Sequence, residues 1–502
     1  MAEQRPFYVT TAIPYVNAPP HIGHALLFVY TDATARYERL LGKDVRFVTG
    51  TDEHGQKIAQ KAAEATLAPR AFVDQISQTV RDMVARLNIS NTDFVRTTEE
   101  RHRQAVEAFW KRVEANGHIY KKRYGGLYCI GCEQFKTEKE LIDGKCPDHL
   151  IVPDYIEEEN YFFRLSSFAP QLRELYATHP HYVVPDSRFN EMKQLVESGL
   201  EDMSISRSAE RLSWGIPVPG DPTQVIYVWF DALINYLTGA GFALDEAEFV
   251  RYWPADVHFL GQEINRFHSI LWVAMLMAAK LDVPKQFAVH GWITVDGKKM
   301  SKTLGNVISP EDLATTFTVD GMRYLLLREF SFWGDGDYSR ERFLQRYESD
   351  LANDLGNLVY RVTSMLQKYR DGVVPQSTDG DRPVAWDDIG RAMGEYRFDL
   401  ALEAIWNVIR EANQLVDQSK PWTLAKEGKD AELDAVLYRL LETVRQIGWM
   451  VRPFMPTTSD KILRQLGQET ADATIDAVSV WGGLRAGTRL ESGEPLFPRL
   501  EA

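Results

Sequence analysis

With 502 residues, 44% of them hydrophobic and 25% charged, the chain has an ordinary folded composition and enough apolar content for two to four domains. Its three cysteines exclude a disulfide framework, and no apolar run reaches the roughly 18–20 residues of a membrane-spanning helix. The net charge of −14 argues only weakly against a nucleic-acid partner, because such binding depends on local basic patches. The N-terminus lacks a charged-then-apolar leader, so we expect a cytoplasmic protein.

The first quarter of the chain alternates apolar strands with helices. We predict strands at 7–12 and 45–49, and helices at about 23–41, 54–65 and 70–87. Apolar strands separated by helices predict an α/β fold, namely a Rossmann-type, doubly wound parallel sheet with both faces covered. Ligands of such sheets bind beyond the carboxyl ends of the strands.

This alternation stops near Gly117 and resumes after residue 205. Residues 117–205 hold all three cysteines and short strand-like pieces such as 160–164, which indicates an insertion. Strands are again predicted at 225–228, 257–260 and 286–289, the first leading into a helix from Asp231, and a hairpin at 292–297. From about Ser339 the pattern is helical only, with one long helix over about 340–369.

We therefore predict five segments. They are the first half of the Rossmann domain at 1–116, an inserted connective domain with a zinc knuckle at 117–205, the second Rossmann half at 206–325, a linking segment at 326–350 and an α-helical domain at 351–502.

Two short strings in this framework indicate chemistry. The first is His21-Ile22-Gly23-His24, after the first strand, and the second is Lys299-Met300-Ser301-Lys302, after the hairpin. Two histidines at a helix start can both face a triphosphate, because free N–H groups and the helix dipole favour anions there. Gly23 allows the nucleotide to approach the backbone, and the two lysines can close over the phosphates. Either string alone fits ordinary surface residues, but together they predict activation of a carboxylate by ATP.

The cysteines predict a metal site. Cys129-Ile130-Gly131-Cys132 and Cys146-Pro147-Asp148-His149 are two Cys/His pairs, each with two residues inside the pair. Cys129, Cys132, Cys146 and His149 suit tetrahedral Zn2+. Because four protein ligands close the coordination shell, we expect one structural zinc per chain.

The two strings resemble the HIGH and KMSKS signatures of class I aminoacyl-tRNA synthetases. Residues 12–17, 50–55, 227–232, 267–269 and 299–306 narrow the resemblance to methionyl-tRNA synthetases, in order and over nearly the whole chain. The resemblance implies activation of L-methionine by ATP with Mg2+ to methionyl-adenylate, followed by transfer to the 3′-terminal adenosine of tRNA(Met). It also implies that the helical domain is an anticodon-binding helix bundle.

The resemblance assigns roles to individual residues. The catalytic set is His21, Gly23, His24, Lys299 and Lys302, and the ATP-binding set is His21, Gly23, His24, Gly261, Glu263 and Lys302. The methionine-binding set is Ile13, Tyr15, Asp52, Trp229, Ala232, Leu233, Tyr236, Ile264, Phe267 and His268, with Asp52 on the ammonium group. Aromatic side chains suit a thioether, because sulfur contacts rings favourably. Gln262 departs from the lysine expected in this family, which removes a positive charge near the nucleotide.

Three residues of the helical domain match anticodon-reading positions of the family. They are Asn357, Arg361 and Trp422, of which Trp422 would stack on a base while the other two read base edges. Asn357 and Arg361 are four residues apart, so they share one face of a helix. The chain ends soon after residue 499, without room for the C-terminal OB-fold domain that dimerises some members, so we expect a monomer.

Two alternatives remain at this stage. The first is a class I synthetase for leucine, isoleucine, valine or cysteine. The branched-chain enzymes carry an editing insert for which residues 117–205 are too short, and the cysteine enzyme binds zinc at its substrate with ligands not seen near His24. The second is a non-catalytic tRNA-binding relative, which would be expected to have lost His21, His24 or Lys302, and all three are present.

Overall fold

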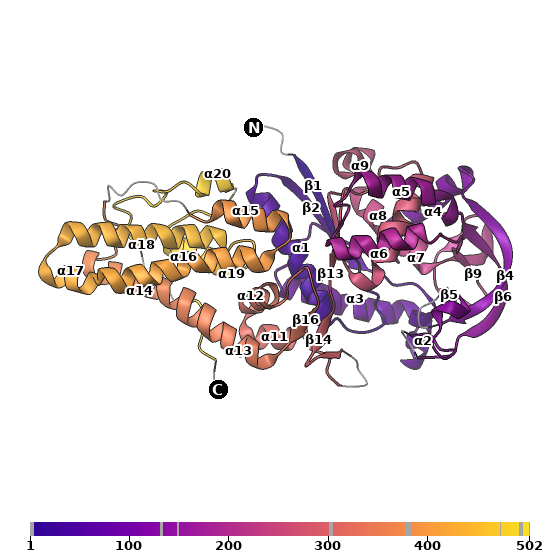
Figure 1. Cartoon of the computed structure of the whole chain (residues 1–502), viewed down its shortest axis with the longest axis horizontal. Helices are drawn as coiled ribbons and strands as arrows, with labels where there is room; N and C mark the ends of the chain where they lie inside the picture. Colours follow the sequence, from indigo (N-terminus) through magenta and orange to yellow (C-terminus); the bar gives the residue numbers. More distant parts are fainter. Residues whose placement is uncertain are drawn as a thin grey trace.

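The computed structural model describes residues 5–130, 134–147, 150–300, 305–376, 384–471, 473–490 and 495–500. The chain is elongated, with a parallel sheet in the middle, a long two-stranded antiparallel ribbon at one end and a bundle of helices at the other (Figure 1). Over the residues described, no helix combines the length and the apolar character needed to cross a membrane.

The central sheet confirms the predicted fold class. Its strands are all parallel, in the order β3-β2-β1-β12-β13-β7. They are β1 (Pro6–Thr11), β2 (Asp44–Thr51), β3 (Asp93–Arg96), β7 (Val183–Val184), β12 (Val257–Gly261) and β13 (Phe287–His290). The strand order reverses at β1, which lies between β2 and β12, and in sheets of this kind ligands bind at the carboxyl ends of the strands where the order reverses.

The helices of the first part begin and end close to the predicted residues. They are α1 (Ile22–Leu40), α2 (Gln56–Glu64) and α3 (Pro69–Arg86), and a further helix that was not predicted, α4 (Glu100–Ala115), follows them. Fourteen residues of α1 are buried, because this helix lies between the sheet and the helical part of the chain. The strands β3 and β7 were not predicted, since runs of four and two residues carry too little periodicity to be recognised.

One predicted strand–helix unit does not join the parallel sheet. The strand β11 (Asp221–Ile226) instead pairs antiparallel with β9 (Ser206–Ser208) and β10 (Pro217–Val218). The helix that follows, α7 (Val228–Leu233), begins three residues before the predicted start at Asp231. The apolar residues at 225–228 are buried here by antiparallel partners, and apolar content alone does not distinguish the two arrangements.

The insertion is built around a two-stranded antiparallel ribbon. The strands β4 (Ile119–Cys129) and β6 (Asp154–Phe163) pair over ten residues, and β5 (Gln134–Lys136) and β8 (Met203–Ser204) complete a sheet in the order β5-β4-β6-β8. Two helices follow, α5 (Ala169–Thr178) and α6 (Asp186–Glu197), and β7 between them joins the central sheet beside β13.

Beyond β13 the chain forms a small sheet and then the remaining helices. The small sheet holds β14 (Ile293–Val295), β15 (Lys298–Lys299) and β16 (Gly336–Tyr338), so the predicted hairpin is present. The helices include α11 (Pro310–Phe317), α12 (Val319–Glu329), α13 (Arg340–Arg346), α14 (Asn357–Arg370), α15 (Trp386–Gly394), α16 (Phe398–Ser419), α17 (Pro421–Glu427), α18 (Asp430–Met450), α19 (Pro456–Gln465) and α20 (Ile475–Val478). The predicted long helix runs from α13 to α14 through a π-helical stretch, Tyr347–Gly356.

Arg323 on α12 joins the sheet to the helical bundle. Its buried guanidinium pairs with Asp32 of α1 at 2.6 Å and donates to the carbonyl oxygens of Pro453 and Phe454 at 3.2 and 2.8 Å. Asp32 is on α1, which packs against the sheet, and residues 453–454 follow α18 of the helical bundle. The Arg323 side chain therefore contacts both the sheet layer and the bundle.

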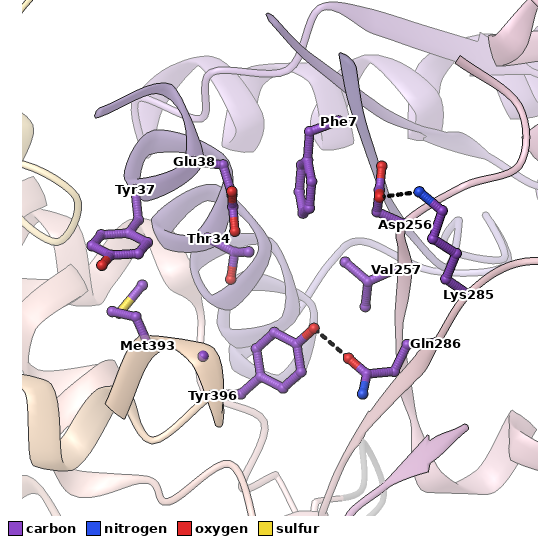
Figure 2. A pocket seen from close by; sticks show the side chains of 11 residues that line it. Phe7, Thr34, Tyr37, Glu38, Asp256, Val257, Lys285, Gln286, Met393 and Tyr396 are labelled. Carbon is purple, nitrogen blue, oxygen red and sulfur yellow. Dashed lines mark hydrogen bonds and ion pairs between the residues drawn. The ribbon is translucent and has the colours of Figure 1, made fainter. Parts of the chain in front are cut away.

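A cavity of about 320 Å³ lies at the same junction (Figure 2). Its walls come from α1, from the amino-terminal ends of β1, β12 and β13, and from the turn after α15, where the Tyr396 hydroxyl donates to Gln286 Oε1 at 2.6 Å. The cavity therefore opens at the amino edge of the sheet, opposite the edge where the predicted site residues lie.

Candidate active site

The predicted catalytic, ATP-binding and methionine-binding residues that the structure describes lie at or beyond the carboxyl edge of the central sheet, near β1 and its neighbours. Tyr15, in the loop after β1, forms an isolated parallel bridge with Asp52, which follows β2. The Asp52 N–H donates to the Pro14 carbonyl at 2.9 Å, and the Val16 N–H donates to the Asp52 carbonyl at 3.0 Å. These bonds hold the Asp52 carboxylate beside the loop that carries Ile13 and Tyr15.

The first string begins α1 and orients both of its histidines. Nδ1 of His21 accepts from the Gly23 N–H at 3.1 Å, and Nδ1 of His24 accepts from the His21 N–H at 3.2 Å. Since each Nδ1 is an acceptor, the ring proton of each neutral histidine is on Nε2. Burial lowers the pKa of His24 to about 3, with smaller effects of His21 and His290. The start of α1 thus carries the ring Nε2–H groups of both histidines, and these donors, together with the helix dipole, suit phosphate oxygens.

Gly23 is required by this arrangement. A Cβ atom at this position would lie 3.0 Å from the His21 ring, closer than side-chain carbons ordinarily pack. The absence of a side chain therefore lets the His21 ring fold over the first turn of the helix.

The second string is described only at its start. Lys299 ends β15, while Ser301 and Lys302 lie outside the described residues, as do the two residues after them. The chain beyond the string returns to the first string, because the Ile22 N–H donates to the Ile308 carbonyl at 3.1 Å. This bond ties the segment that leaves the second string to the first turn of α1.

The predicted nucleotide end of the site follows β12. A Cβ atom at Gly261 would lie 2.7 Å from the Glu263 carboxylate, so the glycine lets this carboxylate fold back over the end of the strand. Gln262 donates to Oδ1 of Asp335 at 3.4 Å, and the Trp292 N–H donates to the same oxygen at 2.8 Å. The residue that departs from the family pattern is thereby held against the loop before β16.

Most of the predicted methionine pocket forms one aromatic cluster. Trp229 of α7 stacks on Phe267 with ring centroids 4.0 Å apart, and His268 stands perpendicular to Trp229 at 6.2 Å. Phe267 and His268 belong to the π-helical turn Arg266–Trp272, a distortion that is frequent at functional sites. Ala232 and Leu233 are buried on α7 next to this cluster, and Ile264 packs at its edge.

The cluster also has a defined polar side. Nδ1 of His268 faces the Ile264 carbonyl at 3.0 Å and must carry the ring proton, so Nε2 accepts from the Tyr236 hydroxyl at 2.7 Å. Burial lowers the pKa of His268 to about 4, so the ring is neutral at pH 7. The pocket thus offers stacked rings and a neutral histidine with both ring nitrogens hydrogen-bonded.

The structure also places residues at this site that the sequence analysis missed. His290 ends β13, and its Nδ1 donates to the Gly291 carbonyl at 2.7 Å. Burial lowers the pKa of His290. A histidine at the carboxyl end of a predicted strand was the available signal. No such signal marked Asp231 and His102, which are described below, because both lie within helices.

Two of the four predicted zinc ligands can be located. Cys129 ends β4 and Cys146 follows a turn, and both are fully buried, while Ile142, Leu150 and Val152 nearby are mostly exposed. Burial of thiols among exposed apolar residues is expected of metal ligands rather than of an apolar core. Cys132 and His149 lie outside the described residues, and over the residues described no group of three potential ligands occurs.

The predicted RNA-binding residues lie on the helical bundle. Asn357 is exposed at the start of α14, and Arg361 one turn later pairs with Asp417 of α16 at 2.7 Å. Trp422 on α17, five residues beyond Asp417, has 46% of its surface exposed. A large aromatic side chain is thus open to solvent near the end of α16 that Arg361 contacts.

The comparisons with known proteins agree with this geometry. Residues 7–152 and 151–363 match the model of the family "tRNA synthetases class I (M)", and residues 389–502 match "Anticodon binding domain of methionyl tRNA ligase". The fold and its site thus define a class I aminoacyl-tRNA synthetase.

Relatives narrow the class to one family. The methionine–tRNA ligases of Caldanaerobacter subterraneus and Thermotoga maritima are 45% and 43% identical over 99% of this chain, and the chain covers 79% and 80% of their lengths. The methionyl-tRNA synthetase of Mycobacterium tuberculosis in complex with methionyl-adenylate has a TM-score of 0.94 at 42% identity, covering 99% of this chain and 100% of that one. Its free form has a TM-score of 0.88 at 39% identity, covering 100% and 99%. This chain belongs to the methionyl-tRNA synthetase family.

Proposed function

We propose that this chain activates L-methionine with ATP and transfers it to tRNA(Met), using the carboxyl edge of the central sheet as its active site. The observation that carries the proposal is the convergence of three features at that edge. They are the ring Nε2–H donors of His21 and His24, the Asp52 carboxylate and the stacked Trp229–Phe267 wall.

In the first step the methionine carboxylate attacks the α-phosphate of ATP, a P–O bond forms, and pyrophosphate leaves. His21 and His24 donate Nε2–H groups to the phosphate oxygens as negative charge develops, together with the Lys299 and Lys302 ammonium groups. Gly261 and Glu263 bind the ribose. Mg2+ bound with ATP would offset the phosphate charge.

The amino acid is held at two points. Asp52 pairs with its ammonium group, and the aromatic cluster encloses the thioether, which leaves the carboxylate free to attack. In the second step a ribose hydroxyl of the terminal adenosine of tRNA(Met) attacks the adenylate carbonyl and AMP leaves. Positioning and charge stabilisation account for both steps without a nucleophilic side chain.

Exchange of labelled pyrophosphate into ATP, measured with each of the twenty amino acids, tests this function. We expect exchange with methionine, and a loss of at least about 100-fold in His24→Ala because a donor to the transition state is removed. Substitution of the exposed His179 by alanine is the control and should retain the wild-type rate. No exchange with methionine, or faster exchange with leucine, would contradict the proposal.

We further propose one structural zinc held by Cys129, Cys132, Cys146 and His149. The supporting observation is the full burial of both described cysteines in a part of the chain with exposed apolar residues. When bound, the metal would hold the ends of β4 and of the turn at Cys146 together. Metal analysis should find about one zinc per chain, and Cys146→Ser should lose it and become sensitive to proteolysis within 119–163. A metal-free wild-type protein with the same protease resistance would exclude this site.

The proposal includes the five-segment division of the chain, which the separate sheet of β4, β5, β6 and β8 supports. It also includes a monomeric state and a cytoplasmic location, where the tRNA substrate is found. Sedimentation equilibrium should give the chain mass of 57.4 kDa, and twice that mass would contradict the monomer.

A further inference from the structure

A buried carboxylate with two histidines lies behind the methionine site. Asp231 on α7 accepts from His54 Nδ1 at 2.6 Å through one oxygen and from His102 Nε2 at 2.7 Å through the other. Asp231 and His102 are fully buried, and His54 is 7% exposed. We call these three residues the His–Asp–His cluster.

The cluster joins the two places where methionine would be held. His54 stands two residues after Asp52, the proposed partner of the ammonium group. Asp231 stands two residues after Trp229 and directly before Ala232, in the helix that forms the wall of the side-chain pocket. The 2.6 Å bond between His54 and Asp231 is therefore a direct link between the two halves of the site.

Neighbouring residues hold both ends of this bond in place. On the α7 side, Nδ1 of His102 lies 2.9 Å from the Thr238 hydroxyl of α8 (Asn235–Ala240). On the β2 side, Trp214 packs edge-on against His54 with ring centroids 5.6 Å apart and donates to the Glu53 carbonyl at 2.6 Å.

The Glu53 side chain is also immobilised, by the Arg96 guanidinium at 2.7 and 3.0 Å. The His54–Asp231 bond thus fixes the position of the loop after β2 relative to the helix α7.

The ionisation state of Asp231 strengthens this link. Burial alone would raise the pKa of Asp231, but His54 and His102 outweigh it and hold the pKa below its usual value. The carboxylate is thus ionised, so its bonds to both rings are charge-assisted and stronger than neutral ones. A rigid buried link of this kind resists changes in distance.

We propose that the His54–Asp231 pair is a positioning device that sets the separation between the Asp52 carboxylate and the aromatic pocket, and thereby selects the length of the amino-acid side chain. This inference rests on the proposed function. Amino acids that are one or two atoms shorter, such as homocysteine, would reach only one of the two binding points. Misplacement by about 1 Å at such a site costs on the order of 100-fold in rate.

The test compares His54→Leu with His54→Asn. The asparagine amide nitrogen can take the place of Nδ1 and donate to Asp231, whereas leucine cannot. For His54→Leu we expect the KM for methionine to rise at least tenfold while the KM for ATP changes less than twofold. The ratio of kcat/KM for methionine over homocysteine in pyrophosphate exchange should fall at least fivefold, and His54→Asn should restore most of both.

A matched control separates positioning from stability. His102→Asn keeps an amide that can hydrogen-bond to Thr238 but loses the bond to Asp231, while the His54–Asp231 bond remains. It should lower the melting temperature yet retain the discrimination ratio within about twofold. Should His54→Leu fail to fold, the comparison of His54→Asn with His54→Gln, whose longer side chain displaces the amide, takes its place.

The outcomes are distinct. Equal loss of kcat/KM for methionine and homocysteine in His54→Leu, or no rescue by asparagine, would overturn the positioning role. If the wild-type protein exchanged no pyrophosphate with methionine, the proposed function itself would fail.

Discussion

At the scale of single residues, the active-site histidines are neutral because they are buried. The pKa values of His24, His268 and His290 are all lowered, and burial is the largest cause in each case. Neutral rings have one donor and one acceptor nitrogen, so each ring has a defined direction in its hydrogen-bond network. The same burial makes the folded state sensitive to acid.

His268 gives the clearest pH prediction. Its pKa is about 4 in the folded protein and about 6.5 when unfolded, so below pH 6.5 the unfolded chain binds a proton that the native state does not. Above pH 6.5, His268 therefore adds no pH dependence to the free energy of unfolding. Below pH 6.5 its contribution to that free energy falls as the pH drops toward 4, and the loss is about 2 kcal/mol at pH 5. Urea unfolding of wild-type protein and His268→Gln at pH 5 to 8 should show a shallower loss in the variant. The exposed His181, replaced by glutamine, should keep the wild-type slope.

Gly23 yields a prediction in which stability and activity separate. Gly23→Ala should slow pyrophosphate exchange at least tenfold, because the new Cβ meets the His21 ring at 3.0 Å. Alanine favours helices over glycine by up to about 1 kcal/mol, so the melting temperature should not fall. Gly394→Ala on α15, where a Cβ has no neighbour within 4 Å, is the control and should keep full activity. Normal exchange in Gly23→Ala would show that the His21 ring need not lie over the first turn.

At the scale of elements, the length of α16 sets the distance between the sheet and the proposed anticodon site. It begins at Phe398, two residues after the Tyr396 of the cavity, and its last turn carries Asp417, the partner of Arg361. Its 22 residues span about 33 Å at 1.5 Å per residue. Changes at the distal end should therefore affect tRNA and leave the chemistry of activation unchanged.

Trp422 tests this separation. Trp422→Ala should leave methionine-dependent pyrophosphate exchange unchanged but lower kcat/KM for charging of tRNA(Met) by about 5- to 150-fold, since stacking on a base contributes about 1–3 kcal/mol. Leu400→Ala, an exposed apolar residue at the other end of α16, is the matched control. Equal charging by both variants would remove Trp422 from the proposed RNA surface.

At the scale of the whole molecule, a buried ion pair contributes to the junction of the sheet and the bundle, beside the apolar core that runs through both. Arg323 and Asp32 are both fully buried, so loss of the arginine leaves a carboxylate with fewer partners in a dry interior. Arg323→Met should cost about 3–5 kcal/mol in the free energy of unfolding, measured by chemical denaturation. Arg103→Met, which breaks an exposed pair with Glu100, should leave the unfolding midpoint unchanged. A midpoint for Arg323→Met equal to that of the wild type would mean that the junction does not depend on this pair.

The sequence by itself determined the fold class and the two strings, because strand–helix periodicity and short motifs are local properties of the chain, while the residue sets proposed for the site came from the resemblance to methionyl-tRNA synthetases. Tertiary structure alone decided which of these residues meet. The bond between His54 and Asp231 joins positions 177 residues apart, and Arg323 joins α12 to both Asp32 and residues 453–454. The antiparallel pairing of β11 and the short strands β3 and β7 were likewise beyond local pattern. Such contacts depend on how the chain closes on itself, and neither composition nor spacing encodes the partner of a buried polar group.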